Sequence, residues 1–463
     1  MAASDAPPGR VPLRTLLIYG APAMPVWFAF MLQSVFLVNF AVDTLLIAPV
    51  VISTIFGASR LWDAVSDPLA GYFSDRTRSR LGRRRSWLLV SIPVLAVGFS
   101  MTWSPPDALS GTDLTVWVGV GIFLFYTGTT LFTIPYESLG AEMTSDHHDR
   151  TRVFGVKQLV AGLGSMAAVG GIYYLVTADD KREAGGVLAI IVSVACCVLI
   201  GLSVWALRER SEYQGRGSTK VLRAFRDVLA NPHAVPLLFV FFIENFGMAM
   251  LAAMAPFLMK YVYNSEEMTP LFLGMYIVPS LLFIPLWIRI SRTVGKRRLW
   301  LFATATLAVG FSLMYFASAE RIGLLFAIVA IVGIGGGCGQ VVGPSIQADV
   351  IDWDEWRTGE RKEGAYFAVW NFMRKTAYGL SAMMVGYVLT GVGFVPNAVQ
   401  TEATLEGMKV IIGFVPGACY TLGFLLLLRF RLDETEHARI RQGLADRAAG
   451  SQADPHTGGR GVS

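Results

Sequence analysis

The chain has 463 residues, of which 54% are hydrophobic and 16% are charged, and its formal net charge is +5. Because an ordinary soluble domain has about 25% charged residues, this composition excludes a soluble globular protein and indicates a polytopic α-helical membrane protein. The four cysteines lie in apolar runs without metal-ligand spacing, so we expect neither a disulfide framework nor a metal cluster built on them.

Apolar stretches of about 20 residues, long enough to cross a bilayer as helices, recur along the whole chain. Charged or Pro/Gly-rich links such as Ser104-Pro-Pro-Asp107 separate them. We count twelve stretches, so the predicted fold class is an all-α membrane protein with 12 transmembrane helices. The stretches fall at 16–40, 46–72, 87–104, 115–141, 153–177, 187–207, 234–261, 270–290, 299–318, 322–348, 364–391 and 408–430.

Lysine and arginine concentrate in alternate links between these stretches. The basic links fall at 76–85, 150–152, 208–233, 289–298 and 357–362, whereas the opposite links hold few basic residues. Cytoplasmic loops of membrane proteins carry such an excess. We therefore expect both termini and the basic links in the cytoplasm. The positive charge reflects topology, and nucleic-acid binding is not expected.

The long basic link near the middle divides the chain into two halves of six stretches each. Gly82-Arg-Arg-Arg85 follows the second stretch and Gly295-Lys-Arg-Arg298 follows the eighth. This recurrence favours two bundles related by an internal repeat, as in many secondary transporters, although short cytoplasmic loops are often basic and Gly-rich. We expect a cytoplasmic N-terminus (1–15), two six-helix bundles (16–207 and 234–430) joined by a cytoplasmic link (208–233), and a cytoplasmic, partly disordered tail (431–463).

Two carboxylates interrupt the second apolar stretch. A helix places Asp63 and Asp67 on one face, one turn apart. An ionised aspartate near the bilayer centre costs about 2.5–3.5 kcal/mol on insertion scales, so the pair requires a positive partner. Arg60, a lysine of another helix, a proton or a small exchangeable cation would each serve. The alternative interpretation is a purely structural ion pair that locks helices together.

The motif around these acids resembles a known family. The run Arg-Leu-Trp-Asp-Ala-Val-Ser-Asp-Pro-Leu-Ala-Gly at 60–71, followed by Gly82-Arg-Arg-Arg85, resembles the second helix and following loop of the glycoside-pentoside-hexuronide:cation symporters. That family is the melibiose-permease-like branch of the major facilitator superfamily. Ile134-Pro-Tyr136 and Ala348-Asp-Val-Ile-Asp352 are further matches, so the resemblance spans about residues 16–430. Animal lysophospholipid symporters share the helix 2 pattern, so the motif indicates a mechanism rather than a substrate.

The resemblance implies a cation site and a major facilitator fold of two six-helix bundles. It places a Na⁺, Li⁺ or H⁺ site at Asp63 and Asp67. Carboxylate and hydroxyl oxygens are the ligands that hard cations prefer. The further members of the expected site are the oxygen donors Thr130 and Ser66 and the charge partners Lys375 and Arg60.

The expected substrate pocket departs from that of the sugar permeases. Trp27 and Thr133 stand where the family has sugar-binding aspartates, Glu137 stands where it has a stacking tryptophan, and Lys157 lies near the place of an arginine. A disaccharide is therefore not expected, whereas a pentoside, a uronide, another polar metabolite or a lysolipid remains open. The candidate substrate-binding residues are Trp27, Thr133, Glu137, Lys157, Tyr126, Glu244, Asn245 and Trp370.

The charged cytoplasmic links are candidates for a gate that holds one state of a transport cycle. The alternative is that they only set topology. The candidate gate residues are Asp75, Arg76, Arg83, Arg84, Asp349 and Asp352.

These observations predict a secondary active symporter that couples the movement of a small organic solute, sugar-like or glycoside-like by family resemblance, to Na⁺ or H⁺, with no cofactor beyond the coupling ion. Efflux by antiport remains open. We expect a monomer in the bacterial cytoplasmic membrane, whose partners are the solute, the cation and the bilayer. Two alternatives are a cation-coupled transporter of an amphiphile such as a lysophospholipid and a non-transporting receptor or sensor on a transporter scaffold. An intramembrane enzyme would need a nucleophile–base set or a metal cluster, and the sequence contains no convincing one.

Overall fold

The computed structural model describes residues 11–144, 147–207, 209, 226, 228–359, 362–430 and 434–452, and every regular element in these ranges is a helix. The predicted all-α class is therefore confirmed. The first half contains α1 (Leu13–Gly20), α2 (Ala23–Val35), α3 (Leu37–Asp43), α4 (Pro49–Arg76), α5 (Arg83–Trp103), α6 (Gly111–Glu142), α7 (His147–Thr177) and α8 (Lys181–Ala206). The second half contains α10 (Ala234–Phe257), α11 (Thr269–Leu282), α12 (Ile284–Val294), α13 (Lys296–Met314), α14 (Ile322–Thr358), α15 (Glu363–Gly391), α16 (Glu402–Arg429) and α17 (Glu434–Gln452).

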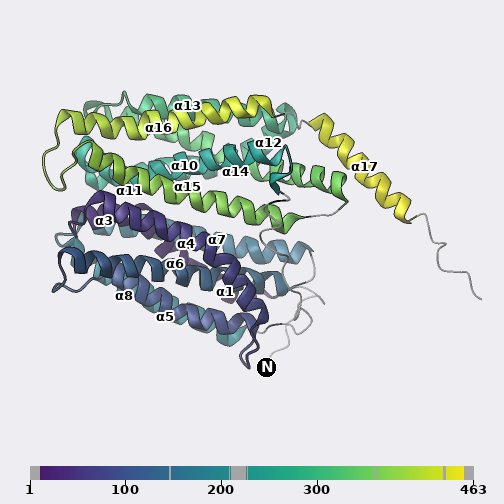
Figure 1. Cartoon of the computed structure of the whole chain (residues 1–463), viewed down its shortest axis with the longest axis horizontal. Coiled ribbons are helices and arrows are strands. Elements are labelled where there is room, and N and C mark those ends of the chain that lie inside the picture. Colours follow the sequence, from purple (N-terminus) through teal and green to yellow (C-terminus); the bar gives the residue numbers. More distant parts are fainter. Residues whose placement is uncertain are drawn as a thin grey trace, which may run out of the picture.

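The long helices of the two halves form two adjacent groups that run in a common direction (Figure 1). Helices α4 and α15 pack against each other where the groups meet, and α7 contacts α11 at a second place along the same interface. The tail helix α17 extends from the end of the second group, where α12 also lies (Figure 1). The arrangement places the acidic face of α4 at the interface between the halves.

Proline and glycine account for several helix ends that differ from the predicted boundaries. The first stretch is divided into α1, α2 and α3, with Pro22 at the first break, where proline lacks the N–H of a regular helix. A break before Pro285 bends α11 and α12 by 40°. The predicted stretch 322–348 continues to Thr358, where Gly359 ends α14 in the left-handed conformation at φ 74°.

Fewer helices than the twelve predicted are both long enough and apolar enough to span a membrane. Among the described residues, eight helices are long and apolar enough to cross a membrane, or nine if the bent pair α11–α12 is one span. Helices α4, α13 and α15 are also at least 19 residues long, but none of them contains a stretch apolar enough to be included. Two of these three helices, α4 and α15, carry the charged side chains of the predicted cation site, and these side chains lower the mean hydropathy of the helices.

Small residues allow α4 and α15 to approach closely. A Cβ atom added to Gly386 of α15 would lie 2.3 Å from the Cβ atom of Ser53 and 2.5 Å from the carbonyl oxygen of Pro49. A Cβ atom added to Gly379 would lie 3.0 Å from the Cβ atom of Arg60. Glycine permits such backbone contact between membrane helices, and this contact brings the side chains of α15 within reach of the acids on α4.

We predict that Gly386→Ala lowers the thermal midpoint of the purified protein, because overpacking of this kind costs about 1–3 kcal/mol. Gly391→Ala on the same helix is the control, since a Cβ atom there would meet no atom within 4 Å. Differential scanning fluorimetry in detergent measures both midpoints. Equal midpoints for the two variants would contradict the close approach of α4 and α15.

Candidate functional site

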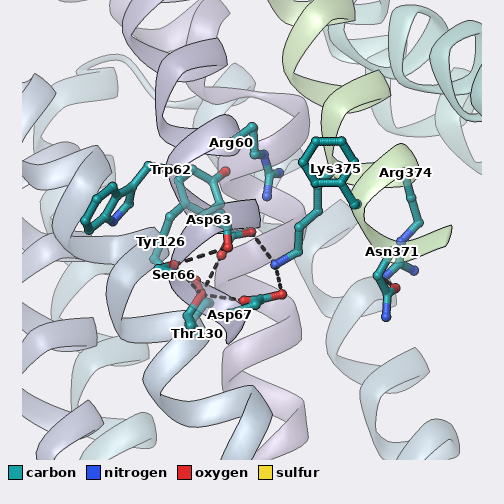
Figure 2. A network of polar contacts seen from close by, with 12 residues as sticks. Arg60, Trp62, Asp63, Ser66, Asp67, Tyr126, Thr130, Asn371, Arg374 and Lys375 are labelled. Atoms are coloured by element: carbon teal, nitrogen blue, oxygen red, sulfur yellow. Dashed lines mark hydrogen bonds and ion pairs between the residues drawn. The ribbon is translucent and has the colours of Figure 1, made fainter. Parts of the chain in front are cut away.

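Asp63 and Asp67 lie near the middle of α4 and face the interface between the halves (Figure 2). Asp63 is buried, with 4% of its surface exposed, and Asp67 is half-buried. The predicted placement of both acids on one helical face is what the structure shows. Two carboxylates so close together in a poorly solvated region repel each other, so their ionised forms require neighbouring positive charge.

Lys375 of α15 supplies that charge from the other half of the chain. Its Nζ atom lies 2.8 Å from Oδ2 of Asp63 and 2.5 Å from Oδ2 of Asp67. The lysine therefore bridges both carboxylates, as Figure 2 shows. This ion cluster links the two halves of the molecule near the middle of their interface.

The hydroxyl groups of Thr130 and Ser66 complete the cluster. Oγ1 of Thr130 lies 2.5 Å from Oδ1 of Asp63, 2.9 Å from Oδ1 of Asp67 and 3.3 Å from Oγ of Ser66. One hydroxyl hydrogen can be donated to only one carboxylate at a time. The second short oxygen–oxygen contact is favourable only when a proton or a cation is shared there. The oxygens of two carboxylates and two hydroxyls thus converge as ligands that suit a hard cation.

The cluster differs in composition from a transition-metal centre. Among the described residues, no group of three or more His, Cys, Asp or Glu side chains is arranged to hold a metal ion. The soft or imidazole ligands that such metals prefer are not part of the Asp63–Asp67 cluster. Its ligand atoms are carboxylate and hydroxyl oxygens together with the ammonium group of Lys375.

Arg60 lies beside the cluster but has a different environment from the one expected. Its guanidinium carbon lies 4.0 Å from the centre of the Tyr126 ring and 4.8 Å from that of Phe30, and its Nη2 atom donates to Ser34 at 2.7 Å. Cation–π contacts stabilise a buried guanidinium in this way. In the described part of the chain, Lys375 and not Arg60 forms the ion pairs with the aspartates. The candidate substrate residue Tyr126 instead packs against Arg60.

Two cavities adjoin at the interface, and they differ in polarity. The first, of about 310 Å³, contains the ion cluster, and the second, of about 220 Å³, is bordered mainly by apolar side chains. Trp27, Phe30 and Tyr378 border both. The polar cavity is lined by Val26, Trp27, Phe30, Arg60, Asp63, Asp67, Thr129, Thr130, Thr133, Ile134, Glu137, Asn371, Arg374, Lys375 and Tyr378.

Part of the predicted substrate set lines the polar cavity. Trp27, Thr133 and Glu137 do so, and Lys157 donates to Glu137 at 2.6 Å. Glu137 and Lys157 therefore form an ion pair. It forms on the wall contributed by α6 and α7.

The remaining predicted substrate residues lie outside the linings of both cavities. Glu244 accepts a hydrogen bond from Nε1 of Trp300 at 2.5 Å, and Asn245 donates to the carbonyl oxygen of Phe241 at 2.7 Å. Trp370 is buried against Tyr366 in the core of the second half. The rotation of α10 and α15 directs Glu244 and Trp370 into their own bundle, and a substrate-binding role for Glu244, Asn245 and Trp370 stays a prediction. The sequence does not determine that rotation.

The predicted cytoplasmic gate residues contact partners in their own half. Arg83 and Arg84 lie 2.8 Å and 3.4 Å from Oε1 of Glu142, and the Arg76 guanidinium lies over the Tyr72 ring. In the second half, Asp349 contacts Lys296 at 2.8 Å and Asp352 contacts His437 of α17 at 3.1 Å. The side chain of Asp75 is outside the described residues. Apart from the Arg76–Tyr72 contact, which lies within α4, these described contacts join helices of the same half.

A charged cluster at the opposite end of the molecule joins the two halves, and the sequence analysis missed it. Asp43, at the end of α3, accepts hydrogen bonds from Nζ of Lys260 and from Oη of Tyr261, both at 2.7 Å. Lys260 also donates to Oδ1 of Asn397 at 2.8 Å. Its sequence signal is a single lysine at the end of the apolar run 234–261. The side chains of Lys181 and Glu266 form a second ion pair between the halves.

Comparison with known proteins gives consistent matches along most of the chain. The model of the family described as "MFS/sugar transport protein" matches residues 18–434. The uncharacterized symporter YjmB of Bacillus subtilis (strain 168) is 26% identical over 447 residues, which cover 94% of this chain and 96% of the relative. The putative glycoside/cation symporter YagG of Escherichia coli (strain K12) is 25% identical and covers the same shares of each chain.

A more distant relative and a solved structure extend these matches. Sodium-dependent lysophosphatidylcholine symporter 1 of Xenopus tropicalis is 22% identical over 450 residues, which cover 88% of this chain and 85% of the relative. The crystal structure of a D-xylose-proton symporter superimposes with a TM-score of 0.66 at 13% identity, covering 91% of this chain and 98% of the other. At that identity, the likeness establishes the fold.

Proposed function

Because the chain belongs to the MFS/sugar transport protein family, we propose that Asp63, Asp67 and Thr130 bind the coupling ion of a transport cycle. The relatives are symporters and the structural neighbours are transporters, so the chain is a cation-coupled symporter rather than an enzyme. The observation that carries the ion-site proposal is the convergence of the Thr130 hydroxyl on both carboxylates.

Lys375 makes the proposed site responsive to the ion. In this structure the lysine offsets one of the two carboxylate charges, which leaves the cluster with one net negative charge if both aspartates are ionised. A bound Na⁺ or proton lowers that negative charge and competes with the lysine for the same oxygens. Because Lys375 belongs to α15 and the aspartates to α4, ion binding weakens one connection between the halves. Cation and substrate then favour each other's binding reciprocally.

The identity of the ion follows from the ligands in the same proposal. A proton needs only one carboxyl oxygen, whereas Na⁺ gains from each additional oxygen donor within reach. The hydroxyl groups of Thr130 and Ser66 therefore favour Na⁺ over H⁺. A relative whose name describes it as sodium-dependent is compatible with this preference.

The proposed substrate is a small organic solute that occupies the polar cavity. The family description and the glycoside/cation relative favour a sugar-like or glycoside-like molecule. Trp27, Thr133 and Glu137 replace the disaccharide-binding residues, so the pocket favours a different solute. A lysophospholipid-like amphiphile is the second candidate, since an apolar cavity adjoins the polar one and one relative is named a lysophosphatidylcholine symporter.

The cluster around Asp43 is proposed to close the extracellular end. With the basic links in the cytoplasm, as the positive-inside rule favours, the Asp43–Lys260 and Lys181–Glu266 pairs lie at the extracellular end. The ion pairs between the halves at that end hold the cavity closed to the exterior. We further propose a monomer in a bacterial cytoplasmic membrane, with both termini in the cytoplasm.

We predict that Na⁺ raises the thermal midpoint of the purified protein, and that Asp63→Asn and Asp67→Asn each abolish this response. A ligand that binds only the folded state stabilises it by about 2.7 kcal/mol at a hundred times its dissociation constant. Scanning fluorimetry in NaCl against choline chloride at constant ionic strength measures the effect. Asp113→Asn, at an exposed position of α6, is the control and should keep the response.

If the thermal midpoint of the wild-type protein changes with pH but not with Na⁺, the coupling ion is a proton and not sodium. A response to neither ion, or a full Na⁺ response in both variants, would contradict the proposed ion site.

We predict that Thr130→Ala weakens Na⁺ binding about tenfold or more, whereas Thr130→Ser preserves it, because only the alanine variant lacks the hydroxyl ligand. A tenfold change corresponds to about 1.4 kcal/mol. Titration of the thermal midpoint with NaCl gives both affinities. If the two variants bind Na⁺ equally well, the hydroxyl is not a ligand.

We predict that Lys260→Met opens the extracellular end, because it leaves the buried carboxylate of Asp43 without its ammonium partner. A cysteine introduced at Ala252, which borders the apolar cavity, reports on access after the four native cysteines are replaced by serine. In right-side-out vesicles, a membrane-impermeant maleimide should label it about tenfold faster, as expected for a shift of about 1.4 kcal/mol. Lys409→Met is the control, and equal rates in the two variants would refute the closure.

A further inference from the structure

Glu244 is an acidic residue within the second half that the proposed ion site does not use. The rest of α10 contains no other acidic or basic side chain. An acidic side chain within a membrane helix is costly, so it is usually paired or functional. Glu244 lies outside the linings of both cavities, so a solute that fills them does not contact it. A ligand of this carboxyl must therefore be small enough to enter the second half itself.

Three other helices of the second half contact this residue. Oε1 of Glu244 accepts a hydrogen bond from Nε1 of Trp300 on α13 at 2.5 Å. The backbone carbonyl oxygen of Glu244 accepts from Oη of Tyr420 on α16 at 3.0 Å. A Cβ atom added to Gly339 of α14 would lie 3.4 Å from Oε2. These contacts fix the position of the carboxyl, while Oε2 has no hydrogen-bond partner among the described residues.

The surroundings of Glu244 supply no positive charge. In the part of the chain that the structure describes, no basic side chain forms an ion pair with it. The titratable groups within electrostatic range are Tyr276 of α11, Cys338 of α14 and Tyr420 of α16, which are uncharged side chains at neutral pH. Asp43 and the aspartates of the ion cluster, by contrast, contact lysines. A carboxylate without a counter-charge in poorly solvated surroundings is unfavourable, and a bound proton removes its charge.

Tyr276 supplies a hydroxyl between the apolar cavity and Glu244. It is 6% exposed, it borders that cavity, and its Oη atom has no hydrogen-bond partner. A Cβ atom added to Gly336 would clash with this oxygen, just as Gly339 lies against the carboxyl. Residues three apart lie on one face of a helix, so the hydroxyl and the carboxyl contact the same face of α14 about one turn apart. A buried hydroxyl without a partner is unfavourable, and a hydrogen-bonded chain toward Glu244 would satisfy it.

We propose that Glu244 is a proton-binding site of the second half, separate from the cation site on α4, and that Tyr276 connects it to the apolar cavity. The proton binds at Oε2, the oxygen without a partner, while Oε1 continues to accept from Trp300. The hydroxyl of Tyr276 accepts a proton from the side of the cavity and donates its own toward Glu244, so it is unchanged after each transfer. The second half then responds to pH, whereas the first half binds the coupling cation.

Infrared difference spectroscopy of the full-length protein in detergent tests for this proton. Transfer from H₂O to D₂O lowers the C=O stretching frequency of a protonated carboxyl whose hydrogen exchanges. At neutral pH, where an ordinary glutamate is ionised, we expect this signal in the wild-type protein and its loss in Glu244→Gln. Glutamine keeps the size of the side chain and an acceptor for Trp300. Glu402→Gln, at an exposed position of α16, is the control and should keep the signal.

Variants of the two neighbouring aromatic residues test the geometry. Tyr276→Phe keeps the ring without the hydroxyl and should slow the exchange of the signal about tenfold or more. Trp300→Phe removes the hydrogen-bond donor to the ionised carboxylate, so the signal should persist to higher pH than in the wild-type protein. Tyr387→Phe, at an exposed tyrosine of α15, is the control for both measurements. Size-exclusion profiles and thermal midpoints verify that each variant is folded.

Identical difference spectra for the wild-type protein and Glu244→Gln would overturn the proton site, and an unchanged exchange rate in Tyr276→Phe would overturn the connection to the cavity. Failure of the coupling site gives a different pattern. Asp63→Asn and Asp67→Asn should keep the Glu244 signal, and a pH response that both variants retain belongs to Glu244. A carboxyl signal that these variants lose and Glu244→Gln keeps would assign the proton to the cation site. If the Glu244 signal is present but Na⁺ has no effect on the midpoint, the proton site stands and the sodium site fails.

Discussion

The ion cluster of Asp63, Asp67 and Lys375 is the interaction on which the rest of the structure depends. Two acids one turn apart are unfavourable in a membrane helix unless positive charge reaches them, and here that charge comes from the other half of the chain. The close packing of α4 and α15 brings the lysine within reach, and the glycine at 386 contributes to it. The same contact that relieves the electrostatic cost therefore also connects the two halves.

The other ion pairs differ between the two ends of the interface that joins the halves. At the end opposite the basic links, Asp43 and Lys260 join the halves, whereas the described ion pairs of Arg83 and Lys296 join helices within one half. Between these ends lie two adjoining cavities, one polar and one apolar. An ion that competes with Lys375 would alter the contact at the centre, while the Asp43 cluster would control access at one end. In an alternating-access cycle, the contact at Lys375 and the contact at Asp43 would then respond to different events, ion binding at the first and opening of one end at the second.

The positions of the candidate site residues were predictable where a short-range pattern determines them. A spacing of four residues places Asp63 and Asp67 on one face of any helix, and the family motif pointed to Thr130 and Lys375, which the structure brings to the same carboxylates. Glu244 and Trp370 lie outside both cavity linings. A polar or aromatic residue in an apolar helix identifies a special position without identifying the direction in which it faces. Asn371, next to Trp370 in sequence, lines the polar cavity because one residue corresponds to about 100° of helix rotation.

The sequence by itself determined the class of protein, the helical character of its segments and the acid pair, because composition and helical periodicity act over short distances. The tertiary structure decided which basic side chain pairs with the two aspartates. Arg60 and Lys375 were both candidates, and only the packing of α4 on α15 distinguishes them. It also decided that Asp43 meets Lys260, which lies 217 residues later in the chain. Contacts between halves depend on helix rotation and interhelical distance, and no local pattern in the chain specifies either.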